Sequence, residues 1–251
     1  MQVRQVDAKQ GWQWILTGFF LFRKAPLVWI ILCFTLLLIA ATLALVPIAG
    51  QFIFTLLSPV FLAGVMIGCK TLDEGGRLEV THLLAGFRGT ASPLITIGGI
   101  YLVGQVLIVG VFMLVGGDVL MGLLLEGKRV DENELRNVSG DMLSASLVAL
   151  VLTIPLLMAV WFAPLLVKFG NMPALDAMRS SFVACLKNII PLQVYGITMV
   201  VVMTILIMLA SALLGPSFIV QLAVIMLMSP ILFASIFASY RDIFLESAEA
   251  A

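Results

Sequence analysis

The sequence predicts an all-α membrane protein, a polytopic bundle of six transmembrane helices. Four long stretches contain no Asp, Glu, Lys, Arg or His, namely residues 25–69, 89–117, 142–167 and 188–240. Each exceeds the roughly 20 apolar residues that a helix needs to cross a bilayer, and the first and last are long enough to cross twice. With 62% hydrophobic and 11% charged residues, the composition excludes a water-soluble domain.

The third observation is the distribution of positive charge. The expected spans are 25–47, 51–69, 92–115, 143–167, 189–213 and 218–240. Of the 14 Lys and Arg residues, 11 fall on one side of these spans, and the other three, Lys128, Arg129 and Arg136, share one loop with six acids. Because Lys and Arg concentrate in cytoplasmic loops, both termini are expected in the cytoplasm. A net charge of +0 gives no indication of a nucleic-acid partner.

The first span is expected to stay in the mature protein, because the apolar run from Ala25 is too long for a signal peptide. A short amphipathic segment precedes each odd-numbered span and is expected to lie as a helix in the cytoplasmic membrane interface. Their apolar faces are Trp12, Ile15, Leu16, Phe19 and Phe22, then Val80, Leu83, Leu84 and Phe87, and finally Leu175, Met178, Phe182, Cys185 and Leu186. A proline, well suited to a first helical turn, opens each following span at Pro26, Pro93 and Pro191.

The return spans carry an internal repeat. Residues 58–72, SPVFLAGVMIGCKTL, align without a gap with residues 229–243, SPILFASIFASYRDI, and Pro155 with Ala159 offers a weaker third copy. The expected unit is interfacial helix, span and return span, three times within one membrane domain, 1–251, at about 8–76, 77–172 and 173–243. Because each unit begins and ends in the cytoplasm, the symmetry axis should run along the membrane normal.

Prolines and small residues mark these return spans. Pro59, Pro155 and Pro230 are expected to kink them, and the serines before Pro59 and Pro230 to satisfy the carbonyls that the prolines free. Small residues recur four apart, and such faces permit close helix contact within the bundle or between subunits. They are Gly64 and Gly68 in the second span, and Ser235 and Ser239 in the sixth.

The outer loop 116–141 is the one sizeable feature outside the cytoplasm, and a short interfacial helix is expected at 118–125. Besides membrane lipids, we expect a membrane-protein partner to bind through this loop or the interfacial helices. A solvated loop without a partner is the alternative. The oligomeric state is left open.

No constellation of residues predicts catalysis, and no cofactor or metal ligand is predicted. Cys33, Cys69 and Cys185 lack C-x-x-C spacing and are expected to be buried small hydrophobes. Ion-coupled transporters usually hold an ionisable residue in the bilayer, and these spans hold none. Gln105, in the middle of the third span, is the candidate substrate contact, with hydrogen bonding between helices as the alternative.

Three functions follow as hypotheses. The first is a non-enzymatic inner-membrane protein with an accessory, scaffold or assembly role. The second is a permease or lipid-handling protein whose repeats surround a cavity, which a sealed axis would argue against. The third is an intramembrane enzyme that modifies lipid, for which Cys69, Glu79 and His82 form no convincing set.

The opening stretch VDAKQGWQWILTGFFLFRKAPLVW, followed by LVPIAG, LSPVFLAGVMIGCKTLDEGG and LLAGFRG, resembles a family of bacterial inner-membrane proteins of uncharacterised function, known mainly from proteobacteria. More distantly, ALDAMRSSFVACLKNIIPL at 174–192 is similar to the membrane domains of some glycerophosphodiester phosphodiesterases. The resemblance implies a bacterial cytoplasmic membrane and a non-catalytic bundle. It carries over no catalytic residue.

Overall fold

The computed structural model describes residues 3–117 and 132–245, and every regular element within them is helical. Six helical segments are long and apolar enough to cross a membrane. They are α2 (Pro26–Ala44), α3 (Ala49–Asp73), α4 (Ala91–Phe112), α6 (Glu132–Trp161) with α7 (Ala163–Gly170), α9 (Ile189–Leu214) and α10 (Phe218–Phe244). The prediction of an all-α bundle with six spans is therefore confirmed.

Short helices precede three of the spans. They are α1 (Gln10–Lys24), the 3₁₀ helix η1 (Val80–Phe87) and α8 (Ala174–Lys187), and a short π-helical turn, η2 (Met113–Gly117), follows α4. The boundary between α1 and α2 follows from the sequence, because a residue before proline disfavours the helical conformation. Ala25, which precedes Pro26, indeed leaves it, with φ −151° and ψ 60°.

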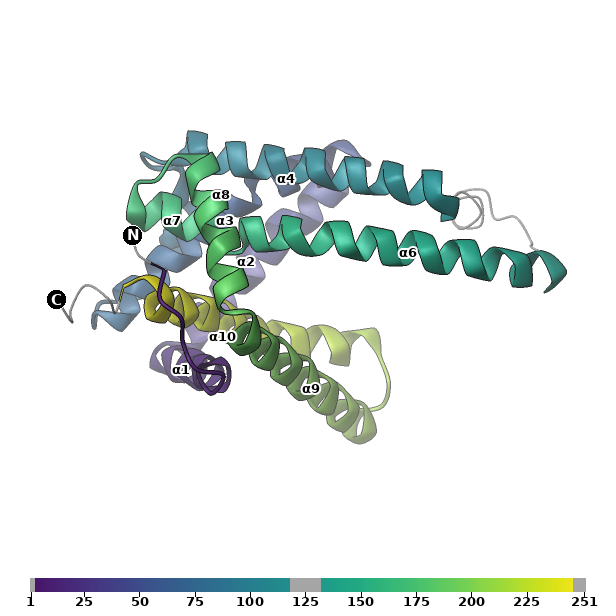
Figure 1. The fold of residues 1–251 in the computed structure, drawn as a ribbon. Helices are drawn as coiled ribbons and strands as arrows, with labels where there is room; N and C mark the ends of the chain where they lie inside the picture. The colour runs from purple at the N-terminus through teal and green to yellow at the C-terminus, as the bar shows by residue number, and fades with distance from the viewer. Residues whose placement is uncertain (1–2, 118–131, 246–251) are drawn as a thin grey trace.

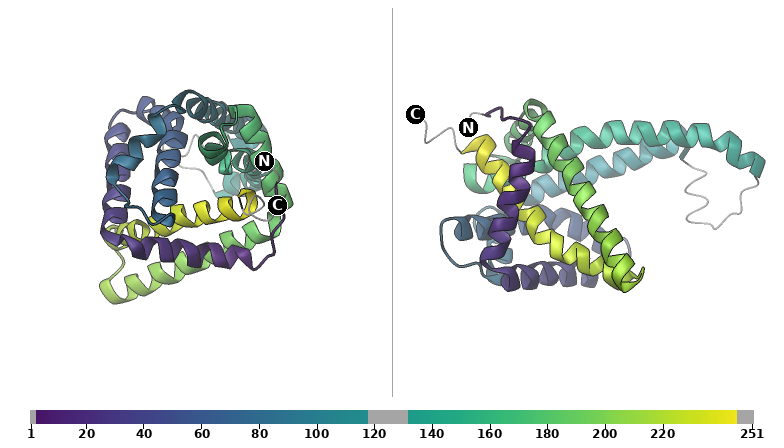
Figure 2. Two further views of the ribbon diagram at one scale, coloured as in Figure 1. Left: turned by 90° about the vertical axis from the view of Figure 1, so that its left-hand side faces the viewer. Right: turned by 90° about the horizontal axis from the view of Figure 1, so that it is seen from below.

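Three hairpins, α2–α3, α4–α6 and α9–α10, extend from a common end of the molecule and diverge away from it (Figure 1). We call this end the hub. It contains α1, η1, α7 and α8 with the adjoining ends of the long helices, and both ends of the described chain lie beside it (Figure 2). Charged side chains join helix ends here, and one pair, Arg241 with Asp73, joins two hairpins. Lys24 Nζ donates to the Leu72 carbonyl over 3.1 Å, Lys168 Nζ to the Arg88 carbonyl over 3.1 Å, and Arg241 pairs with Asp73 over 2.8 Å.

Each return helix packs against the short helix of the next hairpin, and the last packs against the first. Helix α3 contacts η1, α6 contacts α8, and α10 contacts α1. Glycines allow two of these close crossings, because a Cβ at Gly86 of η1 would collide with the Val60 carbonyl, and one at Gly18 of α1 with the Ile231 carbonyl. The three hairpins are thereby closed into a ring at the hub.

The third crossing uses a hydroxyl. The backbone N–H of Phe162 donates to Ser181 Oγ over 2.9 Å, and that hydroxyl donates to the Met158 carbonyl over 2.7 Å. A side chain inserted into the i→i−4 ladder breaks a helix. The span expected as one helix over 143–167 is interrupted at Phe162, where α6 ends and α7 begins with Pro164 in its first turn. By contrast, α6 continues as one helix through Pro155.

The outer loop 116–141 needs a correction, because α6 already begins at Glu132. Residues 132–136, ENELR, are mostly good helix formers, and no proline separates them from the apolar span. The helix expected at 118–125 lies outside the described residues.

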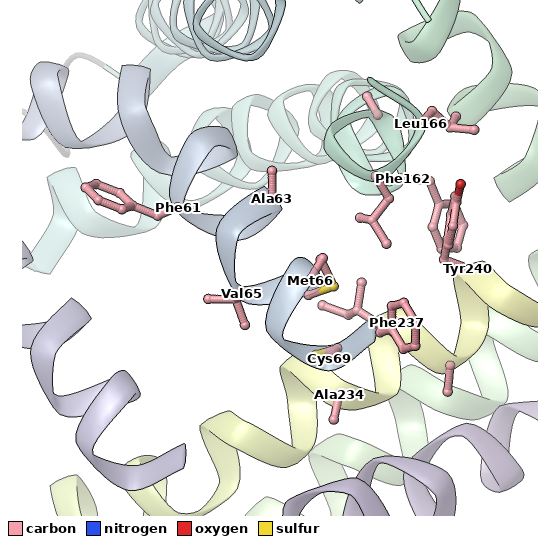
Figure 3. Packing of buried hydrophobic residues seen from close by; sticks show 14 of the residues in the cluster. Phe61, Ala63, Val65, Met66, Cys69, Phe162, Leu166, Ala234, Phe237 and Tyr240 are labelled. Carbon is pink, nitrogen blue, oxygen red and sulfur yellow. The ribbon is translucent and has the colours of Figure 1, made fainter. Parts of the chain in front are cut away.

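The best-packed part of the core lies at the hub end, where α3, α7 and α10 meet. Met66 and Cys69 of α3 are fully buried and lie near Phe237 of α10 (Figure 3). Phe162 and Leu166 approach the same core from the broken span, and Phe162 stacks edge-on against Phe244 with ring centroids 5.6 Å apart. Lipid tails are as apolar as these side chains, so close van der Waals contact, more than water exclusion, holds such helices together.

Candidate functional site

A cavity of about 270 Å³ lies between the three hairpins; we call it the axial cavity. Side chains of α2, α3, α4, α6, α7 and α10 line it, so all three hairpins contribute. Its lining is apolar apart from the hydroxyls of Ser58 and Tyr101, and includes Leu36, Pro59, Val160 and Phe233. At the depth of this cavity the bundle axis is therefore open, and no charged side chain lines it.

The hydroxyl of Ser58 is occupied by the backbone. It donates over 2.9 Å to the carbonyl of Thr55, the group that Pro59 leaves without its helical N–H partner. In the sixth span, Ser229 Oγ donates in the same way to Met226, four residues before Pro230, over 3.2 Å. The Ser-Pro pairs thus keep both helices hydrogen-bonded past their prolines, and the Tyr101 hydroxyl is the polar group left for a ligand in the axial cavity.

A second cavity, of about 420 Å³, lies between α3 and α4; we call it the polar cavity. Gln51, Thr55, Tyr101 and Gln105 line it together with apolar side chains. Gln105 Nε2 donates to the Tyr101 hydroxyl over 2.7 Å. Gln105, which the sequence singled out, therefore lies beside two other polar residues of the spans, Gln51 and Thr55, and beside Tyr101.

Tyr101 lines both cavities, and sequence reasoning did not single it out. The available signal was its spacing from Gln105, because residues four apart on a helix are neighbours. Tyr101 is ten residues along α4 from Ala91, which at 1.5 Å per residue is about 15 Å from the hub end of a membrane about 30 Å thick. Tyr101 therefore borders both cavities near the middle of the membrane.

A third hollow, the side groove, has a volume of about 340 Å³ and lies between α6, α8 and α9. Met158, Trp161, Gln193 and Gly196 are among its lining residues. The buried indole N–H of Trp161 has no hydrogen-bond partner among the described residues. A Cβ at Gly196 would meet no atom within 4 Å, so the groove is open at that position.

Cys185 also lines the side groove, and burial raises the pKa of its thiol to about 12. Its Sγ lies 3.6 Å from the Met158 carbonyl. A thiol that stays protonated at neutral pH is a weak nucleophile, so Cys185 packs here as a small hydrophobe.

The small residues predicted to pack lie at contacts within the chain. A Cβ at Gly64 would collide with the Leu83 carbonyl of η1, and one at Gly68 would lie too close to Leu78. Ser235 is buried and its hydroxyl lies 2.8 Å from that of Tyr195 on α9. Ser239 is also buried and donates to the Ile236 carbonyl over 2.8 Å. None of these four lines the axial or the polar cavity.

Glu79 and His82 cap a helix. The Glu79 backbone N–H donates to His82 Nδ1 over 3.0 Å, and the Glu79 side chain accepts from the His82 backbone, a reciprocal capping box at the start of η1. Cys69 lies apart, in the buried core (Figure 3). Within residues 3–117 and 132–245, no three His, Cys, Asp or Glu side chains form a group that could hold a metal ion.

Six apolar spans with uncharged cavities define an integral membrane protein of the α-helical bundle class. The chain is 32% identical over 203 residues to a probable inner membrane protein of Burkholderia thailandensis, an alignment that covers 78% of this chain and 74% of that protein. It belongs to the same family of bacterial inner-membrane proteins. The predicted inner-membrane location is thereby confirmed.

No family model and no solved structure matches the chain. The distant likeness of residues 174–192 to the membrane domains of glycerophosphodiester phosphodiesterases therefore gains no support.

Proposed function

We propose that this inner-membrane protein is non-enzymatic and has an accessory, scaffold or assembly role, in which it holds a transmembrane helix of another protein at the side groove. The observation that carries the proposal is the weak packing of α9. Only 6% of its most apolar window is buried within the chain, against 50% for α3. Because so little of α9 is buried within its own bundle, most of its surface is available to another membrane component.

The side groove fits a helix at close range. Small residues let helix backbones approach in membranes, and Gly196 stands open on α9 beside the groove. The exposed apolar face continues along α9 through Ile197, Val200, Val201, Ile205, Met208 and Leu209.

An accessory role is favoured over catalysis because the three cavities are lined by amides, hydroxyls, the protonated thiol of Cys185 and apolar groups, but by no carboxylate, imidazole or amine. The three side chains considered for an enzyme are used otherwise, two in a helix cap and one in the core. General acid and base catalysis needs groups placed within hydrogen-bond reach of one another and of a substrate.

Site-specific photo-crosslinking tests this proposal. A photoreactive amino acid replaces Ile197, which is exposed on α9, in the protein expressed in its native membrane. We expect a cross-link to one membrane protein, lost when Gly196→Leu fills the groove mouth. Gly110→Leu is the matched control, because Gly110 of α4 also has open space around it and lies on a different hairpin.

A cross-linked protein that Gly196→Leu leaves unchanged would contradict docking at this groove. So would labelling of lipid alone.

A second candidate, a lipid-handling protein, is favoured by the axial cavity. A bundle that only served as a scaffold would have no need of an open, apolar axis lined from all three hairpins. A lipid is favoured over an ion as the cargo, because residues 25–69, 89–117, 142–167 and 188–240 contain no Asp, Glu, Lys, Arg or His.

A further inference from the structure

The axial cavity and the polar cavity share Tyr101 but differ in chemistry. On the hub side of Tyr101 the lining is apolar, with Leu36, Ile97 and Phe233 among its members. On the other side, Gln51, Thr55 and Gln105 add two carboxamides and a hydroxyl. A molecule that fills both cavities must therefore have an apolar end and a polar end.

The polar end must also be uncharged. No Asp, Glu, Lys, Arg or His occurs in residues 25–69 or 89–117, so α3 above the hub and α4 offer no counter-ion. A phosphate or an ammonium group would enter the polar cavity unpaired, at a high desolvation cost. Carboxamides and hydroxyls instead donate to and accept from neutral groups such as hydroxyls and ester carbonyls.

Two of these polar groups are available. Neither the Gln51 carboxamide nor the Thr55 hydroxyl makes a side-chain hydrogen bond to another residue of the described ranges. The Tyr101 hydroxyl already accepts from Gln105 and still has its own proton to donate. One ligand could therefore accept from Tyr101 and exchange hydrogen bonds with Gln51 and Thr55.

The depths of the cavities match a lipid in the leaflet away from the hub. Gln51 is two residues from the start of α3 at Ala49, the end remote from the hub, whereas Tyr101 lies near the middle of the membrane. A lipid of that leaflet also has its polar end near this boundary and its chain directed toward the middle. The bilayer around the protein supplies such chains at high concentration, whereas a water-soluble solute would leave the apolar end unmatched.

We propose that the two cavities form one site for a membrane amphiphile with an uncharged, hydrogen-bonding headgroup of the glyceride type. The headgroup occupies the polar cavity between α3 and α4, and the acyl chain passes Tyr101 into the axial cavity. Gln105 is a positioning residue that holds the Tyr101 hydroxyl toward the headgroup. The inference rests on the lipid-handling candidate and is independent of helix docking at the side groove.

Photoaffinity labelling in lipid nanodiscs tests the site. The probes are a monoacylglycerol with a diazirine in its acyl chain and a phosphatidylglycerol with the same chain, each added to discs that contain the full-length protein. We expect the monoacylglycerol to label peptides that include Leu36, Ile97 or Phe233, and the phosphatidylglycerol to label them far less.

Two variants address the hydrogen bonds. Tyr101→Phe keeps the ring and removes the hydroxyl, and Gln105→Leu removes the carboxamide. Each should reduce labelling by the monoacylglycerol about fivefold, the effect of about one hydrogen bond. Gly110→Leu, on the same helix at a position that lines neither cavity, should leave labelling unchanged and reports any general effect on α4.

Equal labelling by the two probes would overturn the uncharged headgroup, and labelling that neither variant reduces would overturn the site. If Gln105→Leu unfolds the protein, the effect of Tyr101→Phe on labelling alone tests the site. The crosslink from α9 is measured in a separate experiment. Failure of the lipid labelling therefore does not contradict helix docking at the side groove, and failure of the crosslink does not contradict the lipid site. If the probe labels only the outer faces of the helices, and no peptide that includes Leu36, Ile97 or Phe233, the lipid-handling candidate is overturned as well.

Discussion

The indole N–H of Trp14 donates to Oδ2 of Asp242 over 2.7 Å and joins α1 to α10 across 228 residues of sequence. Both side chains are buried. A second bond lies beside it, from the Arg4 backbone N–H to the Ile243 carbonyl over 3.0 Å. The first bond attaches the last return helix to the first short helix and so completes the ring of hairpins at the hub, and the second attaches the segment before α1 to α10.

Trp14→Phe should therefore weaken ring closure. It removes a hydrogen bond to a buried carboxylate, and we expect the free energy of unfolding to fall by at least about 2 kcal/mol. The measurement is thermal unfolding in detergent. Trp12→Phe is the matched control, because Trp12 lies on the same helix but is exposed. Equal losses in the two variants would contradict the assigned role of the Trp14–Asp242 bond.

Because η1 and α3 cross closely at Gly86, we expect this position to have no space for a side chain. Gly86→Ala places a methyl group against the Val60 carbonyl, and we expect about 1–3 kcal/mol of destabilisation. Gly64→Leu and Ser235→Leu should also destabilise the bundle. Gly110→Ala, in open space, should be neutral or slightly stabilising, since alanine favours helix. The account fails at this contact if Gly86→Ala and Gly110→Ala unfold at the same temperature.

One hydroxyl, that of Ser181, bridges the helix break at Phe162. Ser181→Ala leaves the Phe162 N–H and the Met158 carbonyl without their bridge, so we expect a loss of about 2 kcal/mol or more unless the two segments rejoin as one helix. Ser180→Ala, at the neighbouring position, should change little. Unfolding in detergent measures the stability, and a Ser181→Ala protein as stable as Ser180→Ala, with an unchanged helix break, would contradict this explanation.

The raised pKa of Cys185 predicts slow alkylation. Its thiol ordinarily has a pKa of 9.0 and in the fold has one of about 12, so at pH 8 the folded protein holds almost no thiolate. Alkylation by iodoacetamide should be slow until the protein unfolds. The unfolded chain loses this proton first as the pH rises past 9, so the contribution of Cys185 to stability should decline between pH 9 and 12. Rapid alkylation of Cys185 in the native protein at pH 8 would be evidence against the burial described.

The cytoplasmic position of the hub remains a prediction from the distribution of Lys and Arg. Cys33, Cys69 and Cys185 are buried and give a low background for a cysteine placed at the exposed Thr81 of η1. A membrane-impermeant maleimide should label Thr81→Cys in inverted inner-membrane vesicles and leave it unlabelled in spheroplasts. The opposite pattern would invert the topology.

Much of the fold could be predicted from the sequence, because spans are set by local composition. The stretches without charge place six helices, and the prolines at 26, 93 and 191 lie in their first turns. The start of α6 at Glu132 was missed, because a helix outside the membrane needs no apolar run. The break at Phe162 was also missed, although Pro164 was a local signal for it. The serine that bridges the break comes 19 residues later, and only the folded chain brings it into place.

The site was less predictable for the same reason. Gln105 was noticed as a polar residue in an apolar span, but its neighbours Gln51 and Thr55 come from another helix. Tyr101 carries no signal in its local sequence beyond its spacing from Gln105. The groove beside Gly196 exists because no other part of the chain packs there, and the local sequence cannot predict that.

Quantitative mass spectrometry of the protein extracted from its native membrane into nanodiscs tests the central claim most directly. Wild type, Gly196→Leu and Gly110→Leu are compared for the membrane proteins that each retains. An accessory role at the side groove predicts one membrane protein retained at a stoichiometric level by wild type and Gly110→Leu, and reduced about tenfold or more by Gly196→Leu. Wild-type protein that retains only lipid, or a partner that Gly196→Leu retains equally, would contradict it.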